Sequence, residues 1–176
     1  MARDAQNTLS RAALGTVVFV LLVPVSVVVL GPWLLTGWHL APPLLGWRAT
    51  RWLGGALLVL ALPVFVAFNL RFVVEGRGTP APIAPTERLV VGGPFRWVRN
   101  PGYLSVVALL VGQALVFGSV VLLVYAAVLA LGFHLFVVLY EEPTLRRQFG
   151  AEYETYCRTV RRWVPRLGPA RCQPKR

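Results

Sequence analysis

The chain has 176 residues, of which 56% are hydrophobic and 14% charged, and its formal net charge is +11. An average soluble domain carries about 45–50% apolar and about 25% charged residues, so this composition excludes a soluble globular protein. A basic chain can bind nucleic acid, but here the basic residues flank long uncharged segments. This favours membrane lipid as the partner, and we expect no nucleic acid.

Three long segments without a charged residue predict four membrane-spanning helices. A bilayer core about 30 Å thick needs about 20 helical residues, and the first two segments hold 24 and 19. The third segment holds 41 residues and breaks at Gly118-Ser119, which indicates two helices joined by a tight turn. We therefore expect an all-α, polytopic integral membrane protein that forms a single domain over 1–176, with spans at 12–35, 52–70, 101–117 and 120–140.

The distribution of basic residues predicts the orientation. Of the 18 basic residues, only Arg48 and Arg51 fall between the first and second spans, and the other 16 fall on the opposite side of the membrane. Such an excess is typical of the cytoplasmic side, so we expect both termini there. The chain has 17 arginines and one lysine, a bias that suggests a bacterial protein of the inner membrane.

Glycine and proline mark expected features of these helices. Gly31-Pro32 is expected to end the first helix. Gly112 and Gly118 offer small surfaces at which neighbouring helices can approach closely.

The segment 71–100 is the long polar stretch inside the chain, and we expect it to be a cytoplasmic loop. It is rich in Gly and Pro, so turns shape its backbone, and Pro101 can open the following span. Unwound backbone exposes N–H and C=O groups that can hold a polar ligand. The alternative is an ordinary loop in which Arg96 and Arg99 anchor to lipid phosphates.

Two adjacent carboxylates, Glu141 and Glu142, follow the fourth span. Their place at a membrane boundary and at a helix C-terminus is doubly unfavourable, so they need partners. Holding a cation would satisfy them, and pairing with Arg146 or Arg99 is the alternative. His134 and Gln113 lie deeper in the apolar segments, where a lone polar side chain is more often structural.

The segment 141–166 shows apolar residues at steps of three and four, with arginines on the other surface. This pattern predicts a cytoplasmic amphipathic helix on the membrane surface. Gly150 is the expected bend, and Pro165 is the expected end.

The stretch from Leu89 to Tyr103, LVVGGPFRWVRNPGY, resembles the signature of the isoprenylcysteine carboxyl methyltransferase family, which phospholipid N-methyltransferases share. The tail agrees, because Glu141-Glu142 and the residues up to Val164-Pro165 are similar to the closing pattern of that family. The resemblance covers about residues 72 to 166. It implies an S-adenosylmethionine-dependent membrane methyltransferase with a lipophilic acceptor and a cytoplasmic cofactor pocket, and we expect no metal.

The resemblance also implies roles for single residues. By position, the cofactor-binding residues are Glu87, Arg88, Leu89, Val90, Phe95, Asn100, Tyr103 and Glu141. We assign Glu141, Arg99 and Asn100 to catalysis and Val137 and His134 to the acceptor. Eukaryotic carboxyl methyltransferases carry an Arg four residues before the Glu, where this chain has Val137. This departure favours a neutral or amine-bearing lipid over a prenylcysteine carboxylate.

Two other readings of the sequence remain. Sterol reductases that use NADPH carry a loosely similar Arg-x-Pro-x-Tyr stretch, but they are usually longer. A membrane scaffold or lipid-binding protein would need no chemistry, and it would tolerate changes at Tyr103 and Glu141.

Overall fold

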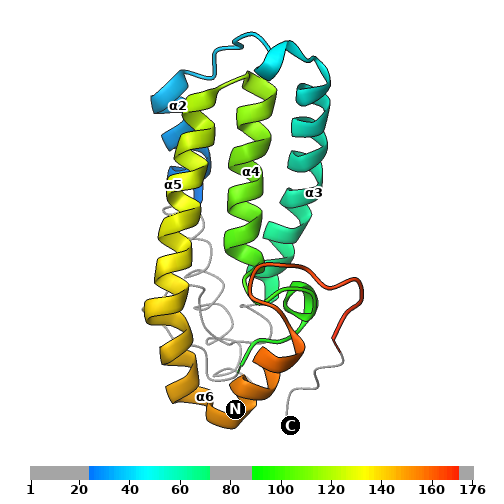
Figure 1. The fold of residues 1–176 in the computed structure, drawn as a ribbon, viewed down its shortest axis with the longest axis vertical. Helices are drawn as coiled ribbons and strands as arrows, with labels where there is room; N and C mark the ends of the chain where they lie inside the picture. The colour runs from blue at the N-terminus through cyan, green and yellow to red at the C-terminus, as the bar shows by residue number, and fades with distance from the viewer. Residues whose placement is uncertain (1–23, 72–88, 171–176) are drawn as a thin grey trace, which may run out of the picture.

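The computed structural model describes residues 24–71 and 89–170. Within these ranges the chain is helical and contains no strand, as predicted (Figure 1). The first part of the span predicted at 12–35 and most of the segment 71–100, Glu87 and Arg88 included, lie outside the described residues.

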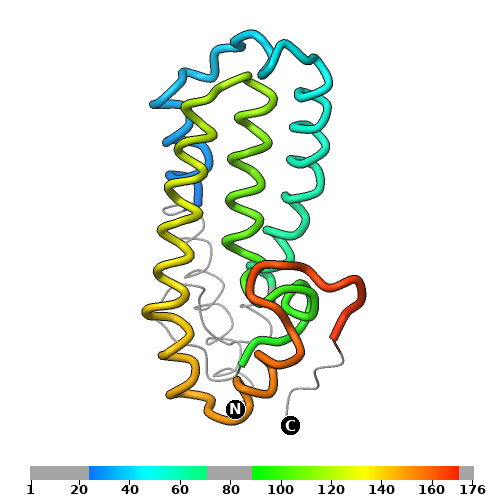
Figure 2. Tube along the Cα trace, viewed as in Figure 1, coloured from blue at the N-terminus to red at the C-terminus, as the bar shows by residue number. Residues whose placement is uncertain are grey.

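Helices α3 (Ala49–Arg71), α4 (Pro101–Phe117) and α5 (Val120–Phe136) lie side by side along the long axis of the molecule (Figure 1; Figure 2). Two helices are long and apolar enough to cross a membrane, Ala49–Leu70 and the continuous Val120–Thr159. Only 17% of the most apolar window of each is buried inside the protein, so most of its apolar surface faces outward. α4 and the Ser26–Thr36 helix are shorter, and the count of four spans stays a prediction.

Small residues bring α3 and α4 together. A Cβ atom added at Gly54 would lie 2.7 Å from the carbonyl oxygen of Gly112, which confirms the close approach predicted at Gly112. Gly118 has a different role. It ends α4 in the left-handed conformation, with φ of 69°, and Ser119 then caps α5 by accepting a hydrogen bond from Leu122 N at 3.3 Å. The predicted break at Gly118-Ser119 is therefore confirmed.

The sequence predicted that the first helix ends at Gly31-Pro32. This prediction is wrong, because the helix continues through both residues. The π-helix η1 (Ser26–Leu30) leads directly into α2 (Gly31–Thr36). Proline fits because it lies in the first turn of α2, where its fixed φ suits a helix.

This continuation leaves two carbonyl groups without a partner in their own helix. The N–H of Gly31 bonds to Ser26 O in the π-helical pattern, which frees Val27 O, and Pro32 has no N–H to bond to Val28 O. Side chains from other helices replace both donors. Tyr125 Oη donates to Val27 O at 3.2 Å, and Gln113 Nε2 donates to Val28 O at 2.8 Å. Gln113 therefore serves the fold.

α5 continues without a break through the π-helix η5 (Val137–Glu141) into α6 (Glu142–Thr159). The chain bends at Gly150, where φ is 49°, as predicted. The helix ends at Thr159 and not at Pro165, because Val160 is extended. Residues 160–170, which we call the strap, then run back along the segment before α4 (Figure 1).

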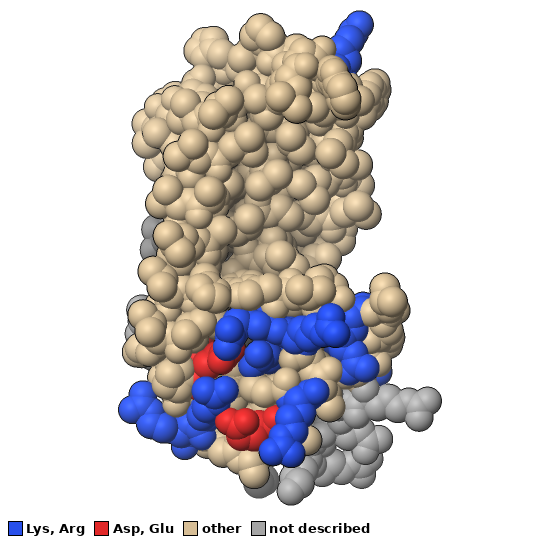
Figure 3. Space-filling view, in the orientation of Figure 1, with Lys and Arg blue, Asp and Glu red and all other residues tan. Residues whose placement is uncertain are grey.

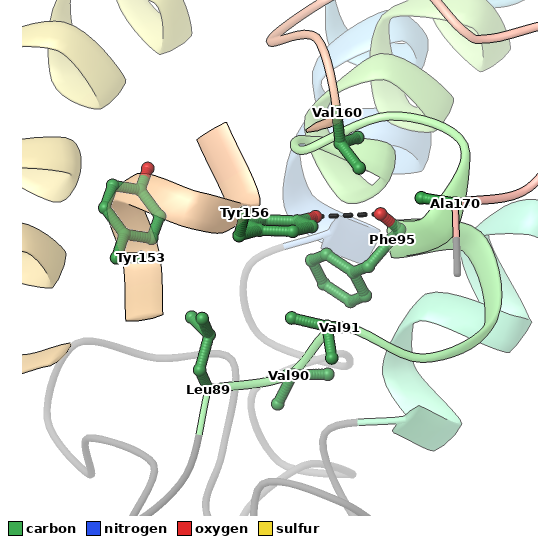
Figure 4. Packing of buried hydrophobic residues seen from close by; sticks show 8 residues of the cluster. All are labelled: Leu89, Val90, Val91, Phe95, Tyr153, Tyr156, Val160 and Ala170. Atoms are coloured by element: carbon green, nitrogen blue, oxygen red, sulfur yellow. Dashed lines mark hydrogen bonds between the residues drawn. The ribbon is translucent and has the colours of Figure 1, made fainter. Parts of the chain in front are cut away.

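The strap, α6 and the loop before α4 enclose a small hydrophobic core at one end of the bundle (Figure 4). Within it, Tyr156 Oη donates to Phe95 O at 2.8 Å. Three backbone hydrogen bonds hold the strap in register with the loop: Arg99 N to Arg161 O, Arg166 N to Trp97 O and Ala170 N to Arg96 O, at 2.9–3.0 Å.

Candidate active site

The charged and apolar surfaces of the protein are sharply divided. Figure 3 shows a belt of arginines around the end that carries α6 and the strap, and an almost uncharged surface over the rest of the bundle. The opposite end carries Arg48, which immediately precedes α3, and Arg51, in the first turn of α3. The belt consists of arginines from the loop before α4, from α6 and from the strap: Arg96, Arg99, Arg146, Arg147, Arg158, Arg161, Arg162 and Arg166.

Tyr103 and Glu141 meet at the ends of the apolar helices, next to the arginine-bearing loop before α4 and α6. Tyr103 lies in the first turn of α4, and its Oη donates to Glu141 Oε2 at 2.9 Å. The Tyr103 ring lies against Phe133 of α5, with 4.8 Å between the ring centroids. The other carboxylate oxygen of Glu141 has no hydrogen bond to a described residue. The pair thus offers a half-buried carboxylate beside two aromatic rings.

Glu142 has a very different environment, because its side chain is only 4% exposed and is surrounded by arginines. Arg162 binds it in a bidentate manner, with Nε–Oε1 of 2.6 Å and Nη2–Oε2 of 2.9 Å. Arg99 Nη1 lies 3.1 Å and Arg146 Nη2 3.8 Å from its oxygens. The ion pairs with Arg146 and Arg99, which the sequence suggested for these two carboxylates, are therefore formed by Glu142 and not by Glu141.

These arginines decide the charge of Glu142. Burial on its own would raise the pKa of the carboxyl group. The hydrogen bonds from Arg162 and the charges of Arg99, Arg162 and Arg146 outweigh burial and hold the pKa below its usual value. Glu142 is therefore an anion at neutral pH, and it ties the strap to α6.

The π-helix η5 begins at Val137 and ends at Glu141. Its closing hydrogen bond runs from Glu142 N to Val137 O, over five residues instead of four. Val137 is buried, with 1% of its surface exposed. Its assignment to the acceptor stays a prediction.

Arg99 and Asn100 connect the start of α4 to the tail. Arg99 Nη1 also donates to Cys157 Sγ at 2.7 Å, and its buried Nε has no partner among the described residues. Asn100 precedes α4 but does not cap it. Its Nδ2 donates instead to Arg162 O at 3.2 Å.

The remaining predicted site residues fall into two groups. Leu89, Val90 and Phe95 are buried in the small core shown in Figure 4. His134 is exposed on α5, where its Nδ1 accepts a hydrogen bond from Trp163 Nε1 at 3.1 Å. The structure brings Tyr103, Glu141, Arg99 and Asn100 to one end of α4 and η5.

Sequence reasoning missed two strap residues, Arg162 and Trp163. Arg162 follows its partner Glu142 by 20 residues and reaches it only because the chain reverses at Gly150. The excess of arginine beside a conspicuous glutamate pair is the signal that could have found it. Within residues 24–71 and 89–170, no group of three or more His, Cys, Asp or Glu side chains could hold a metal ion.

An all-helical apolar bundle with one charged end, where a carboxylate, a hydroxyl and two rings converge, defines a membrane-associated protein with a polar site at its boundary. A family model described as phospholipid methyltransferase matches residues 49–152, more than half of the chain, and the chain belongs to that family. The match points to an enzyme that methylates a lipid-type substrate, and it confirms the resemblance seen in the sequence. Searches of curated proteins and of solved structures gave no significant match.

Proposed function

We propose that this protein transfers a methyl group from S-adenosylmethionine to a lipid acceptor at the cytoplasmic face of the membrane. The observation that carries the proposal is the hydrogen-bonded pair of Tyr103 and Glu141, at the ends of the apolar helices where the arginine-bearing loop before α4 and α6 adjoin them. A site at this level is reached by a water-soluble donor from one side and by a lipid headgroup from the other.

The residues at this pair suit the donor. When bound, S-adenosylmethionine supplies an activated methyl group on a positively charged sulfur. A carboxylate and the faces of aromatic rings stabilise such a cation, and Glu141, Tyr103 and Phe133 provide both within one contact network. Leu89, Val90 and Phe95, together with Glu87 and Arg88, would hold the rest of the molecule.

Methyl transfer requires positioning more than reactive protein groups. The methyl carbon leaves sulfur, which keeps the bonding electron pair, and bonds to a lone pair of the acceptor in an in-line displacement. Holding the reactants in this geometry lowers the barrier without a protein nucleophile. We assign to Glu141 the direct contact and to Arg99 and Asn100 the positioning of the strap and α6 around it.

The acceptor is proposed to be a neutral or amine-bearing lipid. Val137 gives no cation to an acceptor carboxylate, and the guanidinium groups of Arg99 and Arg162 are already bound to Glu142. Burying an unpaired carboxylate is costly, which disfavours a prenylcysteine carboxylate. An amine acceptor must lose its proton before attack, so the rate should rise with pH until the amine is neutral.

The orientation that we propose has four spans in the bacterial inner membrane and both termini in the cytoplasm. A cysteine introduced between Trp38 and Arg48 should then react with an impermeant thiol reagent added to intact cells. Reaction of the native Cys157 or Cys172 under these conditions, with none in the loop, would refute this orientation.

The direct test of the proposed function is binding by the full chain in detergent. We expect saturable binding of S-adenosylmethionine and of its demethylated product, S-adenosylhomocysteine, and none of NADPH. Binding of NADPH alone would support a reductase. Binding of none of the three ligands would support a lipid-binding protein without catalytic activity. Each of these two results would refute the proposed methyltransferase function.

A further inference from the structure

The strap completes a ring of contacts around the Tyr103–Glu141 pair. α4 reaches η5 and α5 through Tyr103, which contacts Glu141 and Phe133. α5 reaches the strap through His134, which accepts a hydrogen bond from Trp163, and their ring centroids are 6.1 Å apart. The strap returns to the start of α4, where Asn100 Nδ2 donates to the carbonyl oxygen before Trp163. Three segments are thus joined in one closed circuit of contacts that includes Tyr103.

The strap is held unequally toward the loop before α4 and toward α5. Toward the loop, three backbone hydrogen bonds and the bidentate Arg162–Glu142 ion pair fix it. Toward α5, it is held by the hydrogen bond from Trp163 to His134 and by the contact between their rings. A neutral hydrogen bond contributes about 1 kcal/mol, whereas bonds to charged groups contribute more. The contact of Trp163 with His134 is therefore the weakest part of the ring.

This weak contact lies on the side that faces lipid. His134 is exposed, and its neighbours Leu131, Leu135 and Phe136 on α5 are 60%, 47% and 38% exposed. Tryptophan prefers the membrane–water boundary, where its ring is in an apolar environment and its N–H finds a polar partner. Tyr103 is less exposed than His134, because its ring packs against Phe133.

Resting on the proposed function, we propose that Trp163 and His134 form a gate on the bilayer side of the site, through which the lipid acceptor reaches Tyr103 and Glu141. The gate opens when the Trp163 side chain leaves His134. The rest of the strap stays in place, because its backbone bonds and Arg162 do not depend on this contact. Trp163 thereby controls access of the acceptor without touching the reacting atoms.

The test measures access directly, with a cysteine behind the gate and a matched cysteine outside it. Phe133→Cys lies behind the gate, since Phe133 is half-buried against Tyr103, and Phe136→Cys lies on the exposed surface of the same helix. Cys157 and Cys172 are replaced by Ser in every variant. The probe is N-pyrenylmaleimide dissolved in phosphatidylcholine vesicles that contain the full chain.

Opening the gate with Trp163→Ala should raise the labelling rate at position 133 about tenfold, which corresponds to about 1.4 kcal/mol, and leave position 136 unchanged. Trp163→Phe keeps a ring but loses the N–H donor, so its increase should be smaller, and this variant keeps the test open if the alanine variant fails to fold. Labelling at position 133 that is the same with Trp, Phe and Ala would overturn the gate. An equal rise at both positions would also overturn it, because the strap would then stabilise the whole bundle.

This experiment needs neither S-adenosylmethionine nor a known acceptor, so its failure and the failure of the proposed function are distinguishable. A chain that binds no S-adenosylmethionine can still show gated labelling. A chain that binds it normally can show labelling independent of Trp163.

Discussion

Two π-helical segments, η1 and η5, occur in the described part of the chain, and the polar groups at the two segments differ in whether protein partners satisfy them. In η1, the groups released by the irregular turn and by Pro32 are the carbonyl oxygens of Val27 and Val28, and Tyr125 and Gln113 satisfy both. At the end of η5, two consecutive carboxylates instead have different partners. Glu142 is surrounded by arginines, and Glu141 keeps one hydrogen bond, from Tyr103.

The difference distinguishes η1, whose irregular turn serves the fold, from η5, which we propose serves a site. Irregular helical turns are frequent at functional sites, but the turn alone does not identify one. At η1 every displaced carbonyl has a protein donor, so nothing is left to bind a ligand. At η5 one carboxylate is neutralised and fixes the structure, which leaves its neighbour available beside two rings.

The largest loss in free energy of unfolding is expected for a substitution at Glu142, the structural carboxylate. Glu142→Gln removes the buried charge that three arginines share. Leaving Arg99, the most buried of them, without its anion should lower the free energy of unfolding by about 3 kcal/mol. Glu154→Gln is the matched control. It breaks a half-exposed pair with Arg146, and such pairs contribute about 0–1 kcal/mol. Thermal unfolding in detergent measures both, and equal losses would show that Glu142 is not the structural carboxylate.

The same cluster predicts how stability depends on pH. The pKa of Glu142 is lower in the folded protein than in the unfolded chain, where it is about 4.3. The stabilisation is therefore complete above that value and is lost as pH falls through the folded pKa. The difference in stability between the native chain and Glu142→Gln should be constant from pH 8 to 6 and should narrow below pH 4. A difference that widens in acid would contradict the assigned charge.

A smaller loss is expected at η1. Gln113→Leu leaves Val28 O without a donor, but it also removes the buried Gln113 Oε1, which has no partner among the described residues. The two effects oppose each other, so the free energy of unfolding should fall by only about 1 kcal/mol. The control is the same change in a Pro32→Ala background, where the restored N–H of residue 32 can bond to Val28 O. If Gln113→Leu lowers the free energy of unfolding as much in the Pro32→Ala background as in the native chain, Gln113 does not act by donating to Val28 O. Binding of S-adenosylmethionine should be unchanged in all of these variants.

The smallest effect is expected at Tyr125, whose hydrogen bond to Val27 O is longer, at 3.2 Å. Tyr125→Phe should cost about 0.5 kcal/mol, measured by the same unfolding transition. If Tyr125→Phe changed the free energy of binding of S-adenosylmethionine more than the free energy of unfolding, η1 would belong to the site and would not be purely structural.

Features with a local chemical cause were readable from the sequence. Gly118 and Ser119 are residues that end one helix and start the next, and Gly150 can adopt a conformation that other residues avoid. The family signature likewise placed Tyr103 and Glu141 together. The π-turns were not readable, because Val137 to Tyr140 is a uniformly apolar run in which one extra residue per turn changes no pattern.

The partners of the site depend on long-range geometry. Arg162 and Trp163 looked like part of a surface helix that would continue to Pro165. Only the early end of α6 at Thr159 sends them back to Glu142 and His134. The sequence alone therefore identified the two carboxylates, but it did not predict that Glu142 would pair with arginines and that Glu141 would bind Tyr103.

The most direct test of the account is the effect of Glu141→Gln on two ligands that differ in charge at sulfur. If Glu141 stabilises the sulfonium, the variant should bind S-adenosylmethionine about ten- to hundredfold more weakly, corresponding to about 1.5–3 kcal/mol, and S-adenosylhomocysteine nearly as well as the native chain does. Isothermal titration in detergent gives both constants, and an unchanged unfolding temperature shows that the fold is intact. Equal weakening of both ligands, or of neither, would contradict the assignment of Glu141 to the reacting centre.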